Sequence, residues 1–178
     1  MKAEWVKRDE MEHVLRALMP ENRLACQVAM ETGLRIGDVL SLKTSKLKQR
    51  MTVQEQKTGK TRRIYLKKSL YDQLIRQAGE VYVFPHRTNG KRHRTRQAVY
   101  KDVVRAAKAF RLENHVSPHS LRKLYAVEEY HRTGNPQAVQ KALNHSDVSI
   151  SALYFLADQL TKRKNQSKLK MGEIRWQC

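Results

Sequence analysis

The chain has 178 residues, 40% of them hydrophobic, which suffices for one globular unit with a buried core. Its 36 Lys and Arg residues exceed its 17 Asp and Glu residues, and the formal net charge is +19. A folded domain this basic is expected to face a polyanion, with nucleic acid as the leading candidate. A ribosomal or histone-like role is the alternative, but the cations are interleaved with periodic apolar residues instead of forming low-complexity tails.

Cysteine usage and hydropathy narrow the class of protein further. Cys26 lies in a helical apolar pattern and Cys178 is the last residue, so neither indicates a disulfide framework or a metal site. No apolar run approaches the length of a membrane span, and the N-terminus lacks the apolar core of a signal peptide. We therefore expect a soluble, cytoplasmic, nucleoid-associated protein without a metal or other cofactor.

The first two predicted elements are helices. Residues 9–18 carry apolar residues at helical spacing after the candidate N-cap Asp9, and Pro20 ends the pattern. A second helix is predicted from about Glu21 to Gly33, which supplies a C-terminal cap.

The sequence TGLRIGDVLSL, residues 32–42, follows these helices. It places Arg35 directly after a glycine-led corner, at the start of another short helix where backbone N–H groups point outward. An anion could bind there. Asp38 lies one turn later and is expected to hold the guanidinium, because a planar fork pairs well with a carboxylate.

From about Met51 the apolar period changes to two, and it resumes at Ile64 after the stretch Lys57-Thr58-Gly59-Lys60. This pattern predicts a β-hairpin with Lys57 at or beside its turn. A further strand is predicted at residues 81–84, followed by the cationic loop 85–94 and a helix from Thr95 to about Phe110. The loop suits a DNA backbone, and the cations of the helix are available to solvent or phosphate.

The stretch 117–154 organises the rest of the chain. Ser117-Pro118 predicts a helix start, so that His119 and Arg122 share one face beside the positive end of the helix dipole. Gly134 is expected to end this helix. Asn135-Pro136 begins a short one, the chain breaks at residues 144–146, and a last helix begins near Asp147.

His145 therefore lies at a corner between helices, and Tyr154 follows nine positions later. Three of the four side chains also have an ordinary explanation. His119 could be an exposed histidine, Arg122 one more cation, and Tyr154 part of an apolar helix face.

Together, H-x-x-R, the leucine-x-His corner and the tyrosine nine residues later resemble the C-terminal signature of the tyrosine recombinases, the phage integrase family. The turn TGLRIGDVLSL resembles the one that holds the first catalytic arginine of this family. The resemblance implies a catalytic set in this order: Arg35, Lys57, His119, Arg122, His145 and Tyr154. Lys60 competes with Lys57, since both lie in the hairpin turn. The implied fold class is mostly α with a small antiparallel β-sheet (α+β).

The resemblance also implies the reaction: metal-independent, site-specific DNA cleavage and rejoining through a 3′-phosphotyrosyl intermediate. Arg35 and Arg122 would stabilise the phosphate charge, and His119 would accept the tyrosine proton. His145 would donate a hydrogen bond, and Lys57 would protonate the leaving 5′ oxygen. Double-stranded DNA is the expected partner, and we assign the following cations to it: Lys60, Arg62, Arg87, Lys91, Arg92, Arg94 and Arg96.

We expect a catalytic domain over residues 1–160 and a tail, 161–178, that docks on a neighbouring protomer of a homo-oligomer, a tetramer on DNA. Accessory DNA-bending proteins are possible partners. The sequence departs from the family at Asn144, where glycine is usual, and by starting directly at the catalytic domain, as a fragment or a short natural relative would. A type IB topoisomerase-like enzyme and a non-catalytic DNA-binding module are the alternatives.

Overall fold

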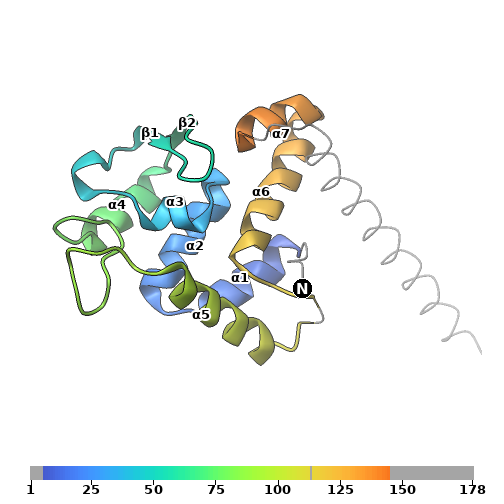
Figure 1. Cartoon of the computed structure of the whole chain (residues 1–178). Coiled ribbons are helices and arrows are strands. Elements are labelled where there is room, and N and C mark those ends of the chain that lie inside the picture. The colour runs from blue at the N-terminus through green and yellow to red at the C-terminus, as the bar shows by residue number, and fades with distance from the viewer. Residues whose placement is uncertain (1–5, 113, 145–178) are drawn as a thin grey trace, which may run out of the picture. The chain divides into compact units, whose positions relative to one another are not determined.

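Helix α2 (Pro20–Thr32) lies at the centre of the first of two compact units, Met1–Tyr125 and Ala126–Cys178. The computed structural model describes residues 6–112 and 114–144. Helix α2 packs against α1 (Arg8–Arg16), α3 (Ile36–Leu40) and α4 (Lys68–Gln77), while α5 (Arg96–Ala109) packs against α1 and α3 (Figure 1). The core is therefore helical, and most residues of α2 are buried, Leu24, Ala25 and Val28 among them.

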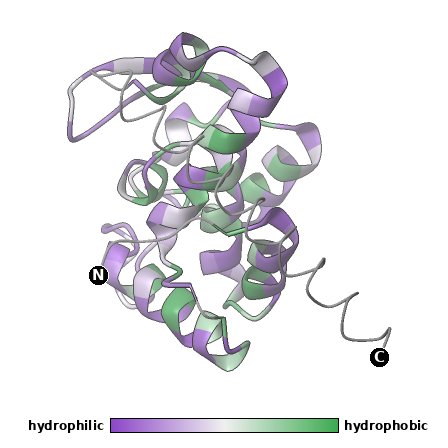
Figure 2. Ribbon diagram, turned by 90° about the vertical axis from the view of Figure 1, so that its right-hand side faces the viewer, coloured by the Kyte–Doolittle hydropathy of each residue, from purple (hydrophilic) through white to green (hydrophobic). Residues whose placement is uncertain are grey.

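The helix boundaries follow the caps that the sequence supplies. Pro20 occupies the first position of α2, where a missing N–H costs nothing. Thr95 caps α5, and its hydroxyl accepts a hydrogen bond from the Ala98 N–H at 3.2 Å. Val99 and Val103 of α5 are fully buried. Green apolar segments alternate with purple polar ones along the helices in Figure 2, as expected for helices with one buried face.

The predicted hairpin is present as strands β1 (Arg50–Gln54) and β2 (Thr61–Tyr65). They pair antiparallel, with Arg50 opposite Tyr65 and Gln54 opposite Thr61. Val53 and Ile64 are buried on one face of this two-stranded sheet, and Lys57 lies in the turn. The fold class predicted from the sequence, mostly α with a small antiparallel sheet, is confirmed.

The strand predicted at residues 81–84 is wrong. The segment makes only single antiparallel bridges, Lys43 with Tyr82 and Pro85 with His93. The residues before Lys43 belong to α3 and its C-terminal turn, and those after it form the short 3-10 helix η1 (Thr44–Lys46), so no extended neighbour continues the ladder. Helix α4 was not predicted, because its first residues offer no side-chain cap and only Leu70 and Leu74 of its face are buried.

Helix α6 (Pro118–Thr133) begins in the first unit and ends in the second. It is followed by α7 (Pro136–Leu143), whose N-cap Asn135 accepts a hydrogen bond from the Gln137 N–H at 2.9 Å. Asn144 ends α7 in the left-handed conformation, with φ of 51°. These ends agree with the sequence, whereas His145, the helix expected near Asp147, Tyr154 and the tail 161–178 lie outside the described residues.

Within the described part of the chain, no helix is both long enough and apolar enough to span a bilayer.

Candidate active site

The site begins at the turn that ends α2. Gly33 has φ of +66°, and a Cβ atom added there would lie 2.4 Å from Cδ1 of Tyr125, so both backbone and packing require glycine. Two residues later Arg35 is the N-cap of α3, and its carbonyl oxygen accepts hydrogen bonds from the N–H groups of Asp38 and Val39. The turn therefore fixes the backbone from which the Arg35 side chain extends.

Two further arginines bind the C-terminal carbonyl groups of α2. Arg62 Nη2 donates to the Thr32 oxygen at 2.6 Å, and Arg122 Nη1 donates to the Gly33 oxygen at 2.5 Å. These carbonyls lie at the negative end of the helix, where cations are favoured. Burial lowers the pKa of Arg62, but an arginine remains charged at any physiological pH. The Arg122 residue is only 2% exposed, so its guanidinium is held firmly beside Gly33.

The carboxylate that pairs with Arg35 is Glu55, at the end of β1, and not Asp38 as expected from the sequence. The Asp38 side chain is buried and instead accepts a hydrogen bond from the Gln56 N–H at 2.9 Å. Burial raises the pKa of Asp38, and the charge of Glu55 adds to this effect, while the hydrogen bond from Gln56 opposes it. Both carboxylates thus connect the Arg35 turn to the hairpin.

Lys57 lies in the hairpin turn, which is closed by two backbone hydrogen bonds. The Glu55 N–H donates to the Lys60 oxygen at 2.9 Å, and the Gly59 N–H donates to the Glu55 oxygen at 2.8 Å. Lys57 and Lys60 are both exposed, but only Lys57 borders the cavity described below. The structure therefore favours Lys57 over its competitor.

His119 stands in the first turn of α6, as predicted. The Ser117 hydroxyl accepts a hydrogen bond from the His119 N–H at 3.3 Å, which confirms the expected helix start. The pKa of His119 is lowered, first by partial burial of the ring and then by the charges of Lys123, Arg122 and other neighbouring cations. Both effects favour the neutral imidazole, the form that can accept a proton.

A cavity of about 480 Å³ brings Arg35, Lys57, His119 and Arg122 together. These four belong to the first compact unit and are four of the six predicted catalytic residues; His145 and Tyr154 lie outside the described residues. The cavity walls come from four segments far apart in sequence: the α2–α3 turn with the start of α3, the hairpin turn, the segment around the start of α5, and the start of α6. Their positive side chains can act on one anion.

Two residues in the cavity wall were not assigned to it from the sequence. His93 Nδ1 lies 2.8 Å from the Arg94 carbonyl oxygen, an acceptor, so Nδ1 carries the hydrogen. Arg96, predicted to contact DNA, also borders the cavity, and a Cβ on Gly37 would lie 3.0 Å from its Cδ atom. Their place in this cavity wall depends on tertiary packing, which no local sequence signal indicates.

The predicted DNA-contacting cations differ in exposure. Five of them are exposed: Lys60, Arg87, Lys91, Arg92 and Arg96. Arg62 is partly buried against α2, and Arg94 is only 8% exposed, with its guanidinium 3.4 Å from a Glu21 carboxylate oxygen. This burial and the contact with Glu21 give Arg94 a role in the fold, while its contact with DNA stays a prediction.

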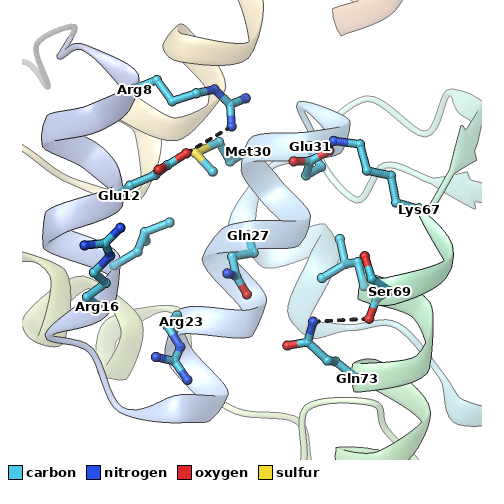
Figure 3. Close-up of a pocket in the computed structure, with 12 residues that line it drawn as sticks. Arg8, Glu12, Arg16, Arg23, Gln27, Met30, Glu31, Lys67, Ser69 and Gln73 are labelled. Atoms are coloured by element: carbon cyan, nitrogen blue, oxygen red, sulfur yellow. Dashed lines mark hydrogen bonds and ion pairs between the residues drawn. The ribbon is translucent and has the colours of Figure 1, made fainter.

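A second cavity, of about 460 Å³, lies between α1, α2 and α4 (Figure 3). It is also bordered by cations, but here Arg8 pairs with Glu12 at 3.6 Å and Lys67 pairs with Glu31 at 2.8 Å. Figure 3 shows Arg16 and Arg23 in the lower left part of the view, and both residues are exposed.

Comparison with known proteins identifies the family. The model of the phage integrase family matches residues 4–160. The chain belongs to this family. It is 31% identical over 145 residues to the probable integrase/recombinase YoeC of Bacillus subtilis (strain 168), and the match covers 75% of this chain and 76% of YoeC. It is also 31% identical over 135 residues to the tyrosine recombinase XerD of Rhizobium meliloti (strain 1021), covering 69% of this chain and 43% of XerD.

Solved structures of phage integrase family members share the fold. The XerH site-specific recombinase bound to palindromic difH substrate matches with a TM-score of 0.70 at 21% identity, covering 94% of this chain and 53% of XerH. A lambda integrase dimer bound to a COC′ core site matches with a TM-score of 0.71 at 22% identity, covering 87% of this chain and 48% of the integrase. The chain thus spans about half the length of these two proteins.

Proposed function

We propose that this protein is a site-specific recombinase that cleaves and rejoins double-stranded DNA through a 3′-phosphotyrosyl intermediate. The observation that carries this proposal is the convergence of Arg35, Lys57, His119 and Arg122 on one cavity of a phage integrase family member. These residue types suit phosphoryl transfer, in which catalysis depends mainly on positioning and on stabilising the negative oxygens.

The proposed reaction uses each side chain in a separate role. The Tyr154 oxygen attacks the scissile phosphorus, and the bond from phosphorus to the 5′ oxygen breaks. Arg35 and Arg122 stabilise the charge on the non-bridging oxygens, and His145 donates a hydrogen bond to them. His119 accepts the phenolic proton, and Lys57 supplies a proton to the leaving 5′ oxygen. A second 5′ hydroxyl can reverse the step, because the ester keeps the bond energy.

Activation of the tyrosine has a defined energetic requirement. With an ordinary phenol pKa of about 10, ionisation at pH 7 costs about 4 kcal/mol. The lowered pKa of His119 keeps the proton acceptor available at neutral pH, and the two arginines favour the developing anion. The site therefore supplies both parts of the activation without a bound cofactor.

DNA recognition and assembly complete the proposal. The exposed cations Lys60, Arg87, Lys91, Arg92 and Arg96 would contact the DNA backbone at the nucleoid. Residues 1–160 would form the catalytic domain, and the tail 161–178 would dock on the next protomer of a tetramer, with accessory DNA-bending proteins as further partners. Support comes from relatives: one matching solved structure is a lambda integrase tetramer bound to a Holliday junction.

The test is covalent capture on nicked duplexes that carry candidate recombination sites, in the presence of EDTA. We expect a denaturant-resistant protein–DNA adduct that disappears in Tyr154→Phe, because the substitution removes the nucleophilic oxygen. Tyr130→Phe is the matched control and should retain the adduct. An adduct that survives Tyr154→Phe would move the nucleophile elsewhere, and the absence of any adduct across sites from the protein's own genomic context would contradict the function.

A further inference from the structure

Glu55 directly follows β1 and is fully buried, with 0% of its surface exposed, although its side chain is a carboxylate. One of its oxygens, Oε2, accepts hydrogen bonds from Arg35 Nη1 and, at 3.2 Å, from the Thr58 hydroxyl. A carboxylate buried this deeply is costly unless it is paired, so its position requires both Arg35 and the hairpin turn. No local sequence pattern indicates this role, because Glu55 lies 20 positions after its arginine partner.

The same residue also holds the backbone of the turn. Its N–H and its carbonyl oxygen form the two hydrogen bonds that close the loop, with Lys60 and Gly59. Gln56 is tied to Asp38 through its N–H, and Thr58 is tied to the Glu55 carboxylate. The residues immediately before and after Lys57 are therefore both anchored, while the lysine itself is exposed.

We propose that Glu55 is a positioning residue that fixes the Lys57 turn against Arg35. The inference rests on the proposed function, since it concerns the placement of the general acid relative to the arginine that holds the phosphate. An arginine has five N–H groups, and the one that Glu55 engages leaves others for an anion in the cavity. The ion pair thus orients the Arg35 guanidinium and also holds the hairpin turn in place beside it.

A purely structural role for Glu55 is the alternative. The two roles predict different effects of the leaving group on the cleavage rate of a Glu55 variant. A lysine that acts as general acid is dispensable when the 5′ oxygen is replaced by sulfur, because a thiolate leaves without a proton. If Glu55 positions Lys57, its loss should affect the ordinary substrate more than the 5′-thio substrate. If Glu55 only supports the fold, both substrates should be slowed by the same factor.

The first experiment does not depend on activity. Amide hydrogen exchange is measured in the DNA-free protein for Glu55→Gln, Glu55→Ala and the control Glu80→Ala, which removes an exposed carboxylate and changes the net charge equally. We expect the Gly59 and Gln56 amides to exchange about tenfold faster in Glu55→Ala, by loss of one charge-assisted hydrogen bond. Glu80→Ala should leave both unchanged. Unaltered exchange in Glu55→Ala would overturn the proposal.

The second experiment measures single-turnover cleavage of matched phosphodiester and 5′-thio duplexes. We expect Glu55→Ala to slow the phosphodiester by about 100-fold and the 5′-thio duplex by about tenfold, the smaller factor reflecting Arg35 alone. Thr58→Val, at an exposed position that does not threaten folding, should show a weaker effect of the same pattern. Equal slowing of both substrates would contradict positioning of Lys57. If the unsubstituted protein forms no adduct, the proposed function fails, while the exchange result still decides the anchoring of the turn.

Discussion

Two cavities of the first unit, the candidate active site and the cavity of Figure 3, are bordered by similar numbers of cations but organise them differently. Around the candidate active site, Arg122 is buried and bonded to a backbone carbonyl, and Arg35 is paired with the fully buried Glu55. Around the cavity of Figure 3, the ion pairs are on the surface: the Arg8 and Glu12 side chains are 41% and 45% exposed. Exposed ion pairs of this kind contribute about 0–1 kcal/mol to stability, so they do little to hold their side chains in one position.

In a chain with net charge +19, positive charge alone therefore does not distinguish the candidate active site from the other cavity. The distinguishing property is that buried carboxylates and helix-end carbonyls hold the guanidinium groups in place before any ligand binds. Such preorganisation is what makes electrostatic catalysis effective, because no reorganisation is needed as the charge develops.

Lys57→Ala should bind DNA normally but slow cleavage of a phosphodiester by about 10²–10⁴-fold, the usual contribution of a general acid. A 5′-thio leaving group should restore most of the rate. Lys60→Ala is the matched control from the same turn and should cleave nearly normally. If Lys60→Ala instead shows the thio-rescued defect, the assignment within the hairpin is reversed.

Gly33→Ala should destabilise the fold by about 3 kcal/mol, because the new methyl group adds a clash with the Tyr125 ring to the strain of a left-handed backbone. Gly134→Ala provides the control: φ is +64° there, but no atom of residues 6–112 or 114–144 lies within 4 Å of the added Cβ, so we expect about 1 kcal/mol. Denaturant unfolding measures both. Equal losses would mean that Tyr125 does not pack against the turn as described.

Local signals in the sequence were enough to predict many of the elements. Ser117-Pro118, Thr95 and Asn135 identified helix starts, and the change to period two identified the hairpin and hence Lys57. The failures depend on tertiary contacts. Spacing favoured Asp38, three residues after Arg35, as the partner of its guanidinium, yet the fold places the Glu55 carboxylate beside it. Arg94 sits in a cationic loop, yet the fold buries it beside Glu21.

Salt dependence of DNA binding should separate exposed from buried cations. Arg92→Ala should reduce the slope of log affinity against log salt by about 1, as expected for one lost phosphate contact. Arg94→Ala should leave the slope unchanged and lower the melting temperature instead, because its guanidinium is buried. A reduced slope in Arg94→Ala would show that this residue contacts DNA after all.

The smallest effect concerns the titration of His119. Its pKa should lie below the ordinary value of about 6.5, because burial and the neighbouring cations disfavour the imidazolium. The folded protein should therefore lose stability as the pH falls from about 6.5 toward this lower pKa, since the unfolded chain binds the proton more tightly. Lys123→Ala should raise the pKa of His119, as followed by NMR of the ring. An unchanged pKa would remove Lys123 from its electrostatic environment.

The most direct test of whether preorganised position or total charge matters compares the loss of one cation from each of these two cavities. Arg35→Ala and Arg16→Ala change the net charge equally, so a difference in cleavage reflects the position of the cation and not the total charge. Single-turnover adduct formation in EDTA should fall by about 10³-fold in Arg35→Ala, as for loss of a preorganised donor to the reacting oxygens, and should change less than about twofold in Arg16→Ala. Similar rates for the two variants would contradict the account.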